Sequence, residues 1–284
     1  MFTVVSNTEL APNVHRLVIQ APRVARARQP GQFVIVRKDE QHGERIPLTI
    51  ADADEQAGTI TVIVQAIGVS TQAIAATPAG GSIRDVAGPL GRPTHIKKWG
   101  RVACIGGGVG TAVLFPMAKA LAEAGNELHV IIGGRSAPFI ILADELKQFA
   151  RAVYLTTEDG SLGRQGLVTH VLGEMLAGTL PRPDAVFAVG PVPMMAAIAE
   201  QTRPAGIPTI VSLNPIMIDG TGMCGGCRVS VGNETKFACV DGPEFDAHQV
   251  DFRGLAQRLK MYRGHEEACR LLSAAPAPAT KEAR

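Results

Sequence analysis

The chain has 284 residues, of which 46% are apolar and 19% charged, with a formal net charge of +2. This length can bury the cores of two or three compact units. The near-neutral charge argues against nucleic acid or an anionic membrane as the main partner. No apolar run approaches the ~20 residues that span a bilayer, and no export signal is visible at the start. We therefore expect a cytoplasmic protein that binds neither a membrane nor nucleic acid.

The N-terminal third predicts a small antiparallel β-barrel. Short runs rich in β-branched residues occur at Val14–Gln20, Gln32–Arg37 and Thr59–Gln65, separated by Pro-Gly and Ala-Gly turn signals. Several short strands at this spacing are typical of such a barrel.

After Trp99 the pattern changes, because strand-like runs begin to alternate with helical stretches such as Thr111–Ala124 and Met194–Gln201. Alternation of this kind predicts βαβ units and a parallel sheet. The predicted strands are Val102–Ile105, Leu128–Ile132, Ala152–Thr156, Ala185–Val189 and Thr209–Leu213.

Two segments of the barrel half are candidates for holding a flavin. The segment 45–50 closes a strand and combines a basic residue for a phosphate with a hydroxyl and backbone positions that could face the ring. The segment 65–71 ends a strand and opens a helix, a second place for an anion. Taken singly, Arg45 is more often a surface charge, and a parallel sheet downstream is what makes it a candidate. The candidate contacts are Arg45, Pro47, Leu48, Thr49, Gln65, Gly68, Ser70 and Thr71.

A glycine-rich turn follows the first predicted strand of the parallel sheet and opens a helix. Glycines there let the backbone approach a pyrophosphate, although they can also simply form a tight turn. Two more loops, at 157–163 and 190–195, follow the third and fourth strands, at the edge where open α/β sheets bind ligands. Their convergence favours a nicotinamide dinucleotide. The candidate contacts are Gly106, Gly108, Gly110, Thr111, Arg135, Glu158, Asp159, Gly160, Gly190, Pro191 and Met194.

Arg135 follows the second strand, where the adenosine ribose is expected. It could meet a 2′-phosphate, which would favour NADPH, or stack on adenine, or be a solvated surface arginine. The sequence leaves these alternatives open.

The C-terminal section contains Asp219-Gly-Thr-Gly-Met-Cys224-Gly-Gly-Cys227, followed by Cys239. With a cysteine in place of Asp219, this is the spacing that holds a plant-type [2Fe–2S] cluster. We therefore predict Asp219, Cys224, Cys227 and Cys239 as ligands. Zinc is an alternative for this donor set, and Asp219 could instead hydrogen-bond beside a cluster that another group completes. A hydride donor and a one-electron cluster need a flavin between them.

The two remaining cysteines have other predicted roles. Cys104 lies inside a predicted strand and is expected to be a small core residue, whereas Cys269 is expected to be a bystander. An odd cysteine count with a C-x2-C pair also argues against a secreted disulfide framework.

Over residues 1–265 the chain resembles ferredoxin–NADP reductase-type flavoproteins with a C-terminal [2Fe–2S] domain. Within that group it resembles the electron-transfer subunit of dihydroorotate dehydrogenase. It is still more similar to the small subunit of NADH-dependent ferredoxin:NADP oxidoreductase, also described as sulfide dehydrogenase. The resemblance is carried by segments 45–52, 106–110, 188–195 and 214–229. The orotate-linked subunits use cysteine as the first ligand, so Asp219 favours the second group.

The chain departs from the wider superfamily at two places. The flavin motif Arg-x-Tyr-Ser/Thr is replaced by a segment with Pro47-Leu48, so no tyrosine stacks on the ring from this segment. Ala188-Val189 precedes the fourth-strand glycine, so no thiol is expected beside the hydride path.

The resemblance implies an electron-transfer flavoprotein subunit that binds NAD(H), FAD and a [2Fe–2S] cluster. Hydride would pass between the nicotinamide and the flavin, from cofactor to cofactor, so no catalytic side chain is assigned. Electrons would then pass singly through the cluster to or from a larger partner carrying FAD and [4Fe–4S] clusters, where NADP(H) and ferredoxin react by flavin-based electron bifurcation. The alternatives are the electron-transfer subunit of dihydroorotate dehydrogenase and a non-catalytic regulatory chain that binds zinc and nucleotides.

The expected fold class is a multidomain β plus α/β protein with an antiparallel β-barrel, a Rossmann-like parallel sheet and a small iron–sulfur subdomain. The expected domains are an FAD-binding barrel at 1–97, an NAD(H)-binding domain at 98–212 and a [2Fe–2S] subdomain at 213–268. An Ala/Pro-rich tail at 269–284 is expected to be disordered.

Overall fold

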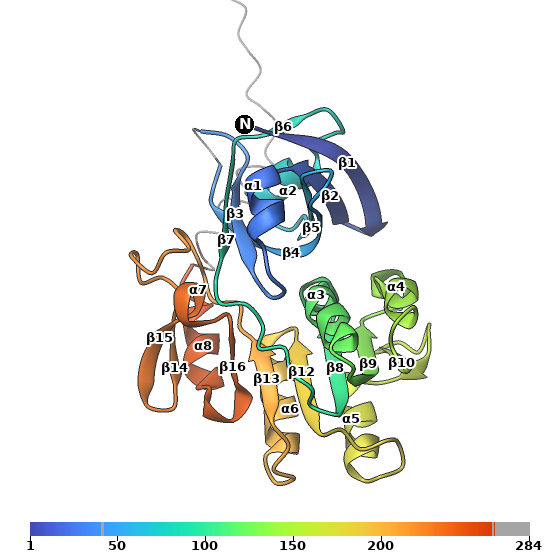
Figure 1. Cartoon of the computed structure of the whole chain (residues 1–284). Coiled ribbons are helices and arrows are strands. Elements are labelled where there is room, and N and C mark those ends of the chain that lie inside the picture. Colours follow the sequence, from blue (N-terminus) through green and yellow to red (C-terminus); the bar gives the residue numbers. More distant parts are fainter. Residues whose placement is uncertain (41–42, 263, 265–284) are drawn as a thin grey trace, which may run out of the picture.

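A computed structural model describes residues 1–40, 43–262 and 264 of the chain. The N-terminal section is a seven-stranded antiparallel sheet with the order β6-β1-β2-β5-β4-β3-β7 (Figure 1). Its strands are β1 (Phe2–Ala11), β2 (Val14–Gln20), β3 (Phe33–Arg37), β4 (Ile46–Asp54), β5 (Thr59–Gln65), β6 (Ser82–Ile83) and β7 (Asp85–Leu90). Two short helices, α1 (Pro22–Ala27) and α2 (Val69–Ala75), accompany it.

Alternation along the strands gives this sheet one apolar interior face. Val34 of β3, Leu48 of β4 and Val62 of β5 lie in one buried cluster, each less than 9% exposed. Successive side chains of a strand point to opposite faces, so Phe33 and Ile35 of β3 point the other way. They join a different core, shared with the rest of the molecule.

The central section is a seven-stranded sheet with the order β11-β10-β9-β8-β12-β13-β16. Its strands are β8 (Arg101–Gly107), β9 (Glu127–Gly134), β10 (Ala152–Thr157), β11 (Arg164–Gln165), β12 (Ala185–Val189), β13 (Thr209–Ser212) and β16 (Glu244–Asp246). All neighbouring strands pair in parallel except β16, which is antiparallel to β13. The five predicted strands of this sheet are all present.

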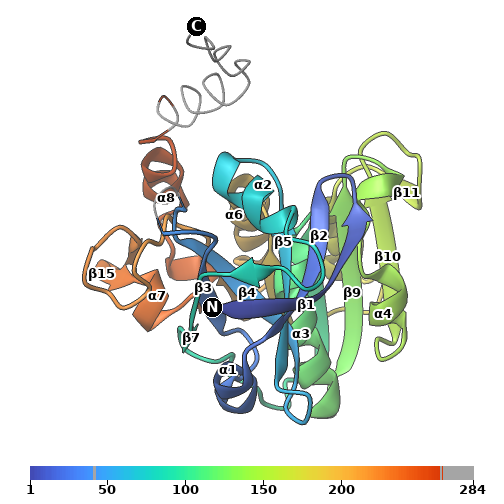
Figure 2. The same cartoon turned by 90° about the horizontal axis from the view of Figure 1, so that it is seen from above.

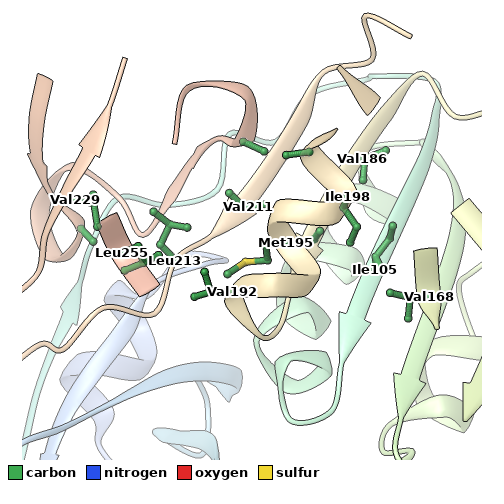
Figure 3. Close-up of a cluster of buried hydrophobic side chains, with 14 of the residues drawn as sticks. Ile105, Val168, Val186, Val192, Met195, Ile198, Val211, Leu213, Val229 and Leu255 are labelled. Carbon is green, nitrogen blue, oxygen red and sulfur yellow. The ribbon is translucent and has the colours of Figure 1, made fainter. Parts of the chain in front are cut away.

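Helices cover both faces of the central sheet, as a doubly wound fold requires. On one face α3 (Gly110–Glu123) and α4 (Ala143–Lys147) pack over the strands. On the other face lie α5 (Val168–Leu176), α6 (Val192–Thr202) and α8 (Phe252–Arg258). These helices bury the apolar core that Phe33 and Ile35 of the barrel also join. Val192, Met195 and Ile198 of α6 belong to this core (Figure 3). A 3-10 turn, Ala137–Phe139, follows β9.

The C-terminal section lies beside the β16 edge of the central sheet (Figures 1 and 2). It contains the hairpin of β14 (Arg228–Val231) and β15 (Glu234–Phe237), the helices α7 (Ala238–Asp241) and α8 (Phe252–Arg258), and a 3-10 turn at Ala247–Gln249. Because β16 belongs to this section and pairs with β13, the section is joined to the central sheet through backbone hydrogen bonds.

The segment between β7 and β8 connects all three sections. Gln32 Nε2 of the barrel donates to the Gly91 carbonyl at 2.9 Å, and Thr94 N donates to the Pro30 carbonyl at 2.8 Å. On its other side, Arg92 N donates to the Gly242 carbonyl at 2.7 Å. These contacts fix the barrel against the section that carries the cysteines.

The expected fold class is confirmed: an antiparallel half-barrel is followed by a parallel sheet with a C-terminal section. The predicted domain boundaries stay a prediction, and the tail at 269–284, with Cys269, lies outside the described residues. Cys104 is fully buried in β8, as expected for a core residue, and burial raises the pKa of its thiol to about 12. Across the described ranges, no helix has the length and apolar character needed to cross a membrane.

Candidate functional site

The turn from β8 into α3 lies against the end of β12. A Cβ on Gly110 would lie 2.5 Å from the Val189 carbonyl oxygen, and one on Gly107 would lie 2.5 Å from Met194 Sδ. Gly108 has a φ of +54°, a conformation that glycine adopts without strain. These glycines therefore serve both the tight turn and the close approach of backbone at this edge.

Thr111 supplies an unpaired polar atom at the same turn. Its side chain is fully buried, and its hydroxyl has no hydrogen-bond partner among the described residues. Buried hydroxyls are nearly always hydrogen-bonded in native proteins. An unpaired hydroxyl in the first turn of α3, beside the glycine backbone, fits a ligand that hydrogen-bonds there.

The loops after β9 and β10 are joined by hydrogen bonds. Asp159 N donates to the Arg135 carbonyl at 3.3 Å, and the Asp159 carboxylate accepts from Ser161 Oγ at 2.6 Å. These bonds from Ser161 hold the pKa of Asp159 below its usual range. At the carboxyl ends of the parallel strands, the structure thus brings Arg135 and the segment 158–160 together on the β9–β10 side of the glycine-rich turn. Gly190, Pro191 and Met194 lie on its β12 side.

The pairing of β3 with β4 decides which predicted flavin contacts share a face. Thr49 is opposite Phe33, and Pro47 is opposite Ile35, on the face turned away from the barrel interior. The Leu48 side chain points the other way, into the barrel core. Only the backbone of Leu48 can therefore meet a flavin on the Thr49 face.

The start of β4 and the start of α2 lie side by side. Ser70 Oγ donates to Glu44 Oε2 at 3.0 Å, which places the exposed Arg45 beside the α2 start. The Thr71 hydroxyl accepts from the Gly68 amide at 2.9 Å, so it closes the turn that follows Gln65. The two predicted phosphate-binding segments, 45–50 and 65–71, are thus neighbours in space, although residues 51–64 separate them in the chain.

The three cysteines and Asp219 fall into two pairs. Cys227 and Cys239 are each 1% exposed, and Cys227 Sγ donates to Cys239 Sγ at 3.2 Å. Cys224 is exposed, and its backbone amide donates to Asp219 Oδ2 at 2.7 Å. Asp219 also accepts from Thr221 N at 2.9 Å. The amide of Thr221, followed by that of Cys224, holds the pKa of Asp219 below its usual range.

The donors are not gathered around one point. In the described chain, no three His, Cys, Asp or Glu side chains converge on one ion site. The donors instead form a buried thiol pair and a second pair nearer the surface. Gly220, Gly222 and Gly225 have φ values of +74°, +86° and +65°, which let the backbone wrap around the site.

The cysteine loop contacts the face that carries the flavin candidates. A Cβ on Gly220 would lie 2.6 Å from Leu90 Cδ1 and 3.0 Å from Ile35 Cγ1. Ile35 is the residue that pairs with Pro47 of β4. One strand of the barrel therefore separates the predicted metal site from the predicted flavin segment.

Sequence reasoning missed several residues that shape this site. Gly107 lies within the glycine-rich segment 106–110, but only the structure shows that Met194 packs on it. Ile35, Leu90 and Gly220 meet although they are far apart in the chain. No local pattern signals such a contact.

Two family models match parts of the chain. A model described as the iron–sulfur cluster binding domain of dihydroorotate dehydrogenase B matches residues 214–251. A model described as an oxidoreductase NAD-binding domain matches residues 104–200. They cover the cysteine loop and the glycine-rich edge.

Similar proteins extend over nearly the whole chain. A dihydroorotate dehydrogenase B (NAD(+)) electron transfer subunit homolog of Thermotoga maritima is 44% identical over 264 residues, 93% of this chain and 92% of the relative. The chain belongs to the family of dihydroorotate dehydrogenase B electron-transfer subunits. The electron transfer subunit of Fusobacterium nucleatum is 31% identical, over 88% of this chain and 97% of the relative. A Clostridium beijerinckii protein of unassigned function is 43% identical over 95% of this chain and 94% of its own.

A solved structure agrees with this family. The NADH-dependent reduced ferredoxin-NADP oxidoreductase structure, described for flavin-based electron bifurcation, superposes with a TM-score of 0.90 and 41% identity, over 97% of this chain and 98% of that chain. A ferredoxin reductase of carbazole 1,9a-dioxygenase shares the fold alone, with a TM-score of 0.59, 20% identity and coverage of 73% of this chain and 65% of that chain. This electron-transfer subunit is therefore a redox subunit of an oxidoreductase, with an NAD-binding domain and an iron–sulfur-binding domain.

Proposed function

We propose that the chain is the small subunit of a bifurcating NADH-dependent ferredoxin:NADP oxidoreductase. It passes electrons between NAD(H), FAD and a [2Fe–2S] cluster, to or from a larger partner subunit. The observation that carries the proposal is the contact of Gly220 with Ile35 and Leu90. This contact brings the cysteine loop against the barrel face on which Thr49 and Pro47 lie.

The flavin supplies the conversion between two-electron and one-electron transfer. In this chain, Arg45 and the start of α2 would hold its phosphates, because they are neighbours in space. Thr49 and Pro47 would orient the ring on their face of the barrel. Phe33 and Ile35, which belong to a buried apolar cluster, would help to exclude water from a ring bound there.

The glycine-rich edge holds the nicotinamide dinucleotide. The turn at 106–110 lets the backbone approach the pyrophosphate, and the free hydroxyl of Thr111 donates to the bound ligand. The backbone amides of Glu158 and Asp159 donate to the carbonyls of Gly134 and Arg135, which brings two acidic residues to the side where the adenosine ribose belongs. A carboxylate accepts from a ribose 2′-hydroxyl and repels a 2′-phosphate, so we assign NAD(H) to this subunit.

Each pair of donors would hold one iron. Cys227 and Cys239, which are buried, would ligate one iron, and Asp219 and Cys224 would ligate the other. Oxygen is a harder donor than sulfur, so two irons held in this way would differ in their electronic environment.

The larger partner carries its own FAD and [4Fe–4S] clusters, and ferredoxin and NADP(H) react there in the cytoplasm. The likeness to the NADH-dependent reduced ferredoxin-NADP oxidoreductase structure supports ferredoxin and NADP(H) as reactants of the complex. The alternative is the electron-transfer subunit of a dihydroorotate dehydrogenase, which the names of the relatives favour. Asp219 decides between them in our proposal, because the orotate-linked subunits are expected to carry cysteine there.

The test is a visible absorption spectrum and metal analysis of the protein, purified without oxygen together with the chains that accompany it. We expect flavin bands, broad iron–sulfur absorption and two irons from this chain in addition to the irons of the partner's clusters. The co-purified complex should reduce ferredoxin and NAD⁺ together at the expense of NADPH. A colourless protein containing zinc would overturn the proposal, and a complex that oxidises dihydroorotate would establish the alternative.

A further inference from the structure

Arg258, in the last turn of α8, contacts the cysteine loop. Its guanidinium donates from Nη2 to the Gly226 carbonyl oxygen at 3.1 Å. Gly226 lies between Cys224 and Cys227, so the cation is fixed to the two-residue spacer of the predicted metal site.

The helix that carries Arg258 is anchored in the main apolar core. Leu255 is 2% exposed and lies beside Leu213 and Val229 (Figure 3). Arg258 comes three residues later, so both side chains lie on the same side of the helix. The Asp251 carboxylate caps the start of the helix by accepting from Gly254 N at 2.9 Å. Packing thus holds the guanidinium at the loop without relying on the metal site.

Arg258 is half-buried, and its surroundings on the side of the loop are mostly apolar. A cavity of about 30 Å³ lies between α8 and the loop, lined by Pro215, Ile216, Leu255 and Leu259 and, at its exposed side, by Met261 and Tyr262. A charge acts more strongly through such surroundings than through water, because the effective dielectric constant is lower.

We propose that Arg258 is a positioning residue that raises the reduction potential of the iron–sulfur cluster. This rests on the proposed function, in which Cys224, Cys227 and Cys239 hold that cluster. One-electron reduction makes the cluster more negative by one charge, and a fixed guanidinium beside the loop stabilises that form. Hydrogen bonding, nearby charge and burial are the means by which a protein sets a cluster potential.

Other charges near the loop are placed differently. Arg228 lies near Gly225 but is exposed to solvent, where water screens its charge. The Arg92 guanidinium lies 3.6 Å from the Asp241 carboxylate, so its charge is largely compensated. Among the described residues, no acidic side chain has an ion pair with Arg258.

The test compares Arg258→Gln, which keeps a hydrogen-bond donor and loses the charge, with Arg258→Lys, which keeps the charge. Arg253→Gln is the matched control, because Arg253 lies on the same helix, is exposed and has no polar contact in the described structure. The readout is the cluster midpoint potential from an EPR-monitored redox titration of the complex, with iron content measured for each variant.

We expect the midpoint potential to fall in Arg258→Gln, to stay near the wild-type value in Arg258→Lys, and to move least in Arg253→Gln. Equal potentials in the Gln and Lys variants, at full iron content, would overturn the inference. Loss of iron from both variants would also overturn it, since Arg258 would then be needed only for assembly. Wild-type protein without iron would instead refute the proposed function.

Discussion

At the scale of single residues, Asp219 has a role even before a metal binds. Its carboxylate accepts from the amides of Thr221 and Cys224, so it folds the loop around the cysteines. A cysteine at this position would provide a sulfur ligand but would not replace both hydrogen bonds. The aspartate therefore serves the shape of the loop as well as the proposed ligation.

We expect Asp219→Cys to keep a cluster and to change its EPR signal and reduction potential. The reason is that thiolate is a softer donor than carboxylate. The measurement is EPR spectroscopy with a redox titration of the anaerobically purified complex. Asp219→Asn is the control, because its side-chain oxygen can still accept from Thr221 N while the anionic donor is lost. A cysteine variant with the wild-type signal would show that Asp219 is not a ligand.

At the scale of secondary-structure elements, the contact between α3 and β12 positions the nucleotide edge. The first residue of α3, Gly110, lies so close to the end of β12 that a Cβ would be 2.5 Å from the Val189 carbonyl oxygen. A methyl group there forces the helix away from the strand, since backbone atoms cannot yield as a flexible side chain can. The packing of two elements thus depends on the absence of one side chain.

We expect Gly110→Ala to lower the free energy of unfolding by about 1–3 kcal/mol and to weaken NADH binding at least tenfold. Gly173→Ala, inside α5, is the matched control, because the nearest atom to a Cβ there is 4.0 Å away. That control should be neutral or stabilising by about 0.5–1 kcal/mol. Denaturant titration and NADH titration measure the two effects. Equal losses in both variants would contradict the close packing.

At the scale of the whole molecule, Glu244 lies where the barrel, the linker and the C-terminal section meet. Thr94 Oγ1 of the linker donates to Glu244 Oε1 at 2.5 Å, and a Cβ on Gly31 of the barrel would lie 2.6 Å from the same oxygen. Burial at this junction raises the pKa of Glu244 to about 7. The folded protein therefore holds a proton here that the unfolded chain releases near pH 4.5.

Because the pKa is raised in the folded state, ionisation of Glu244 costs stability as the pH rises from about 4.5 through 7. We expect Glu244→Gln to match the wild type near pH 4.5 and to be more stable by about 1–3 kcal/mol at pH 8. Thermal unfolding at both pH values measures the difference. Glu55→Gln, at an exposed position, should show no such dependence. A Glu244→Gln advantage that is independent of pH would contradict the prediction.

The strands and helices of the central sheet could be predicted from the sequence because their signals are local. β12 matches the predicted Ala185–Val189, and β2 and β5 match their predicted ranges in the barrel. The strand β1 was missed, since bulges at Val4/Ser6 and Glu9/Ala11 break its alternation. The strand β16 was missed because it has only three residues and owes its place to pairing with β13.

The sequence by itself determined the order of the three sections, the glycine turns and the spacing of Asp219 and the cysteines. Each of these features depends on residues that are close together in the chain. Only the tertiary structure decided that the cysteine loop lies against Ile35 and Leu90, and that Arg258 reaches Gly226. Leu48 is an example. The sequence shows that it lies in the predicted flavin segment 45–50, but only the pairing of β4 with β3 shows that its side chain faces the barrel core. Contacts between distant parts of the chain arise from packing of whole elements, which no local pattern records.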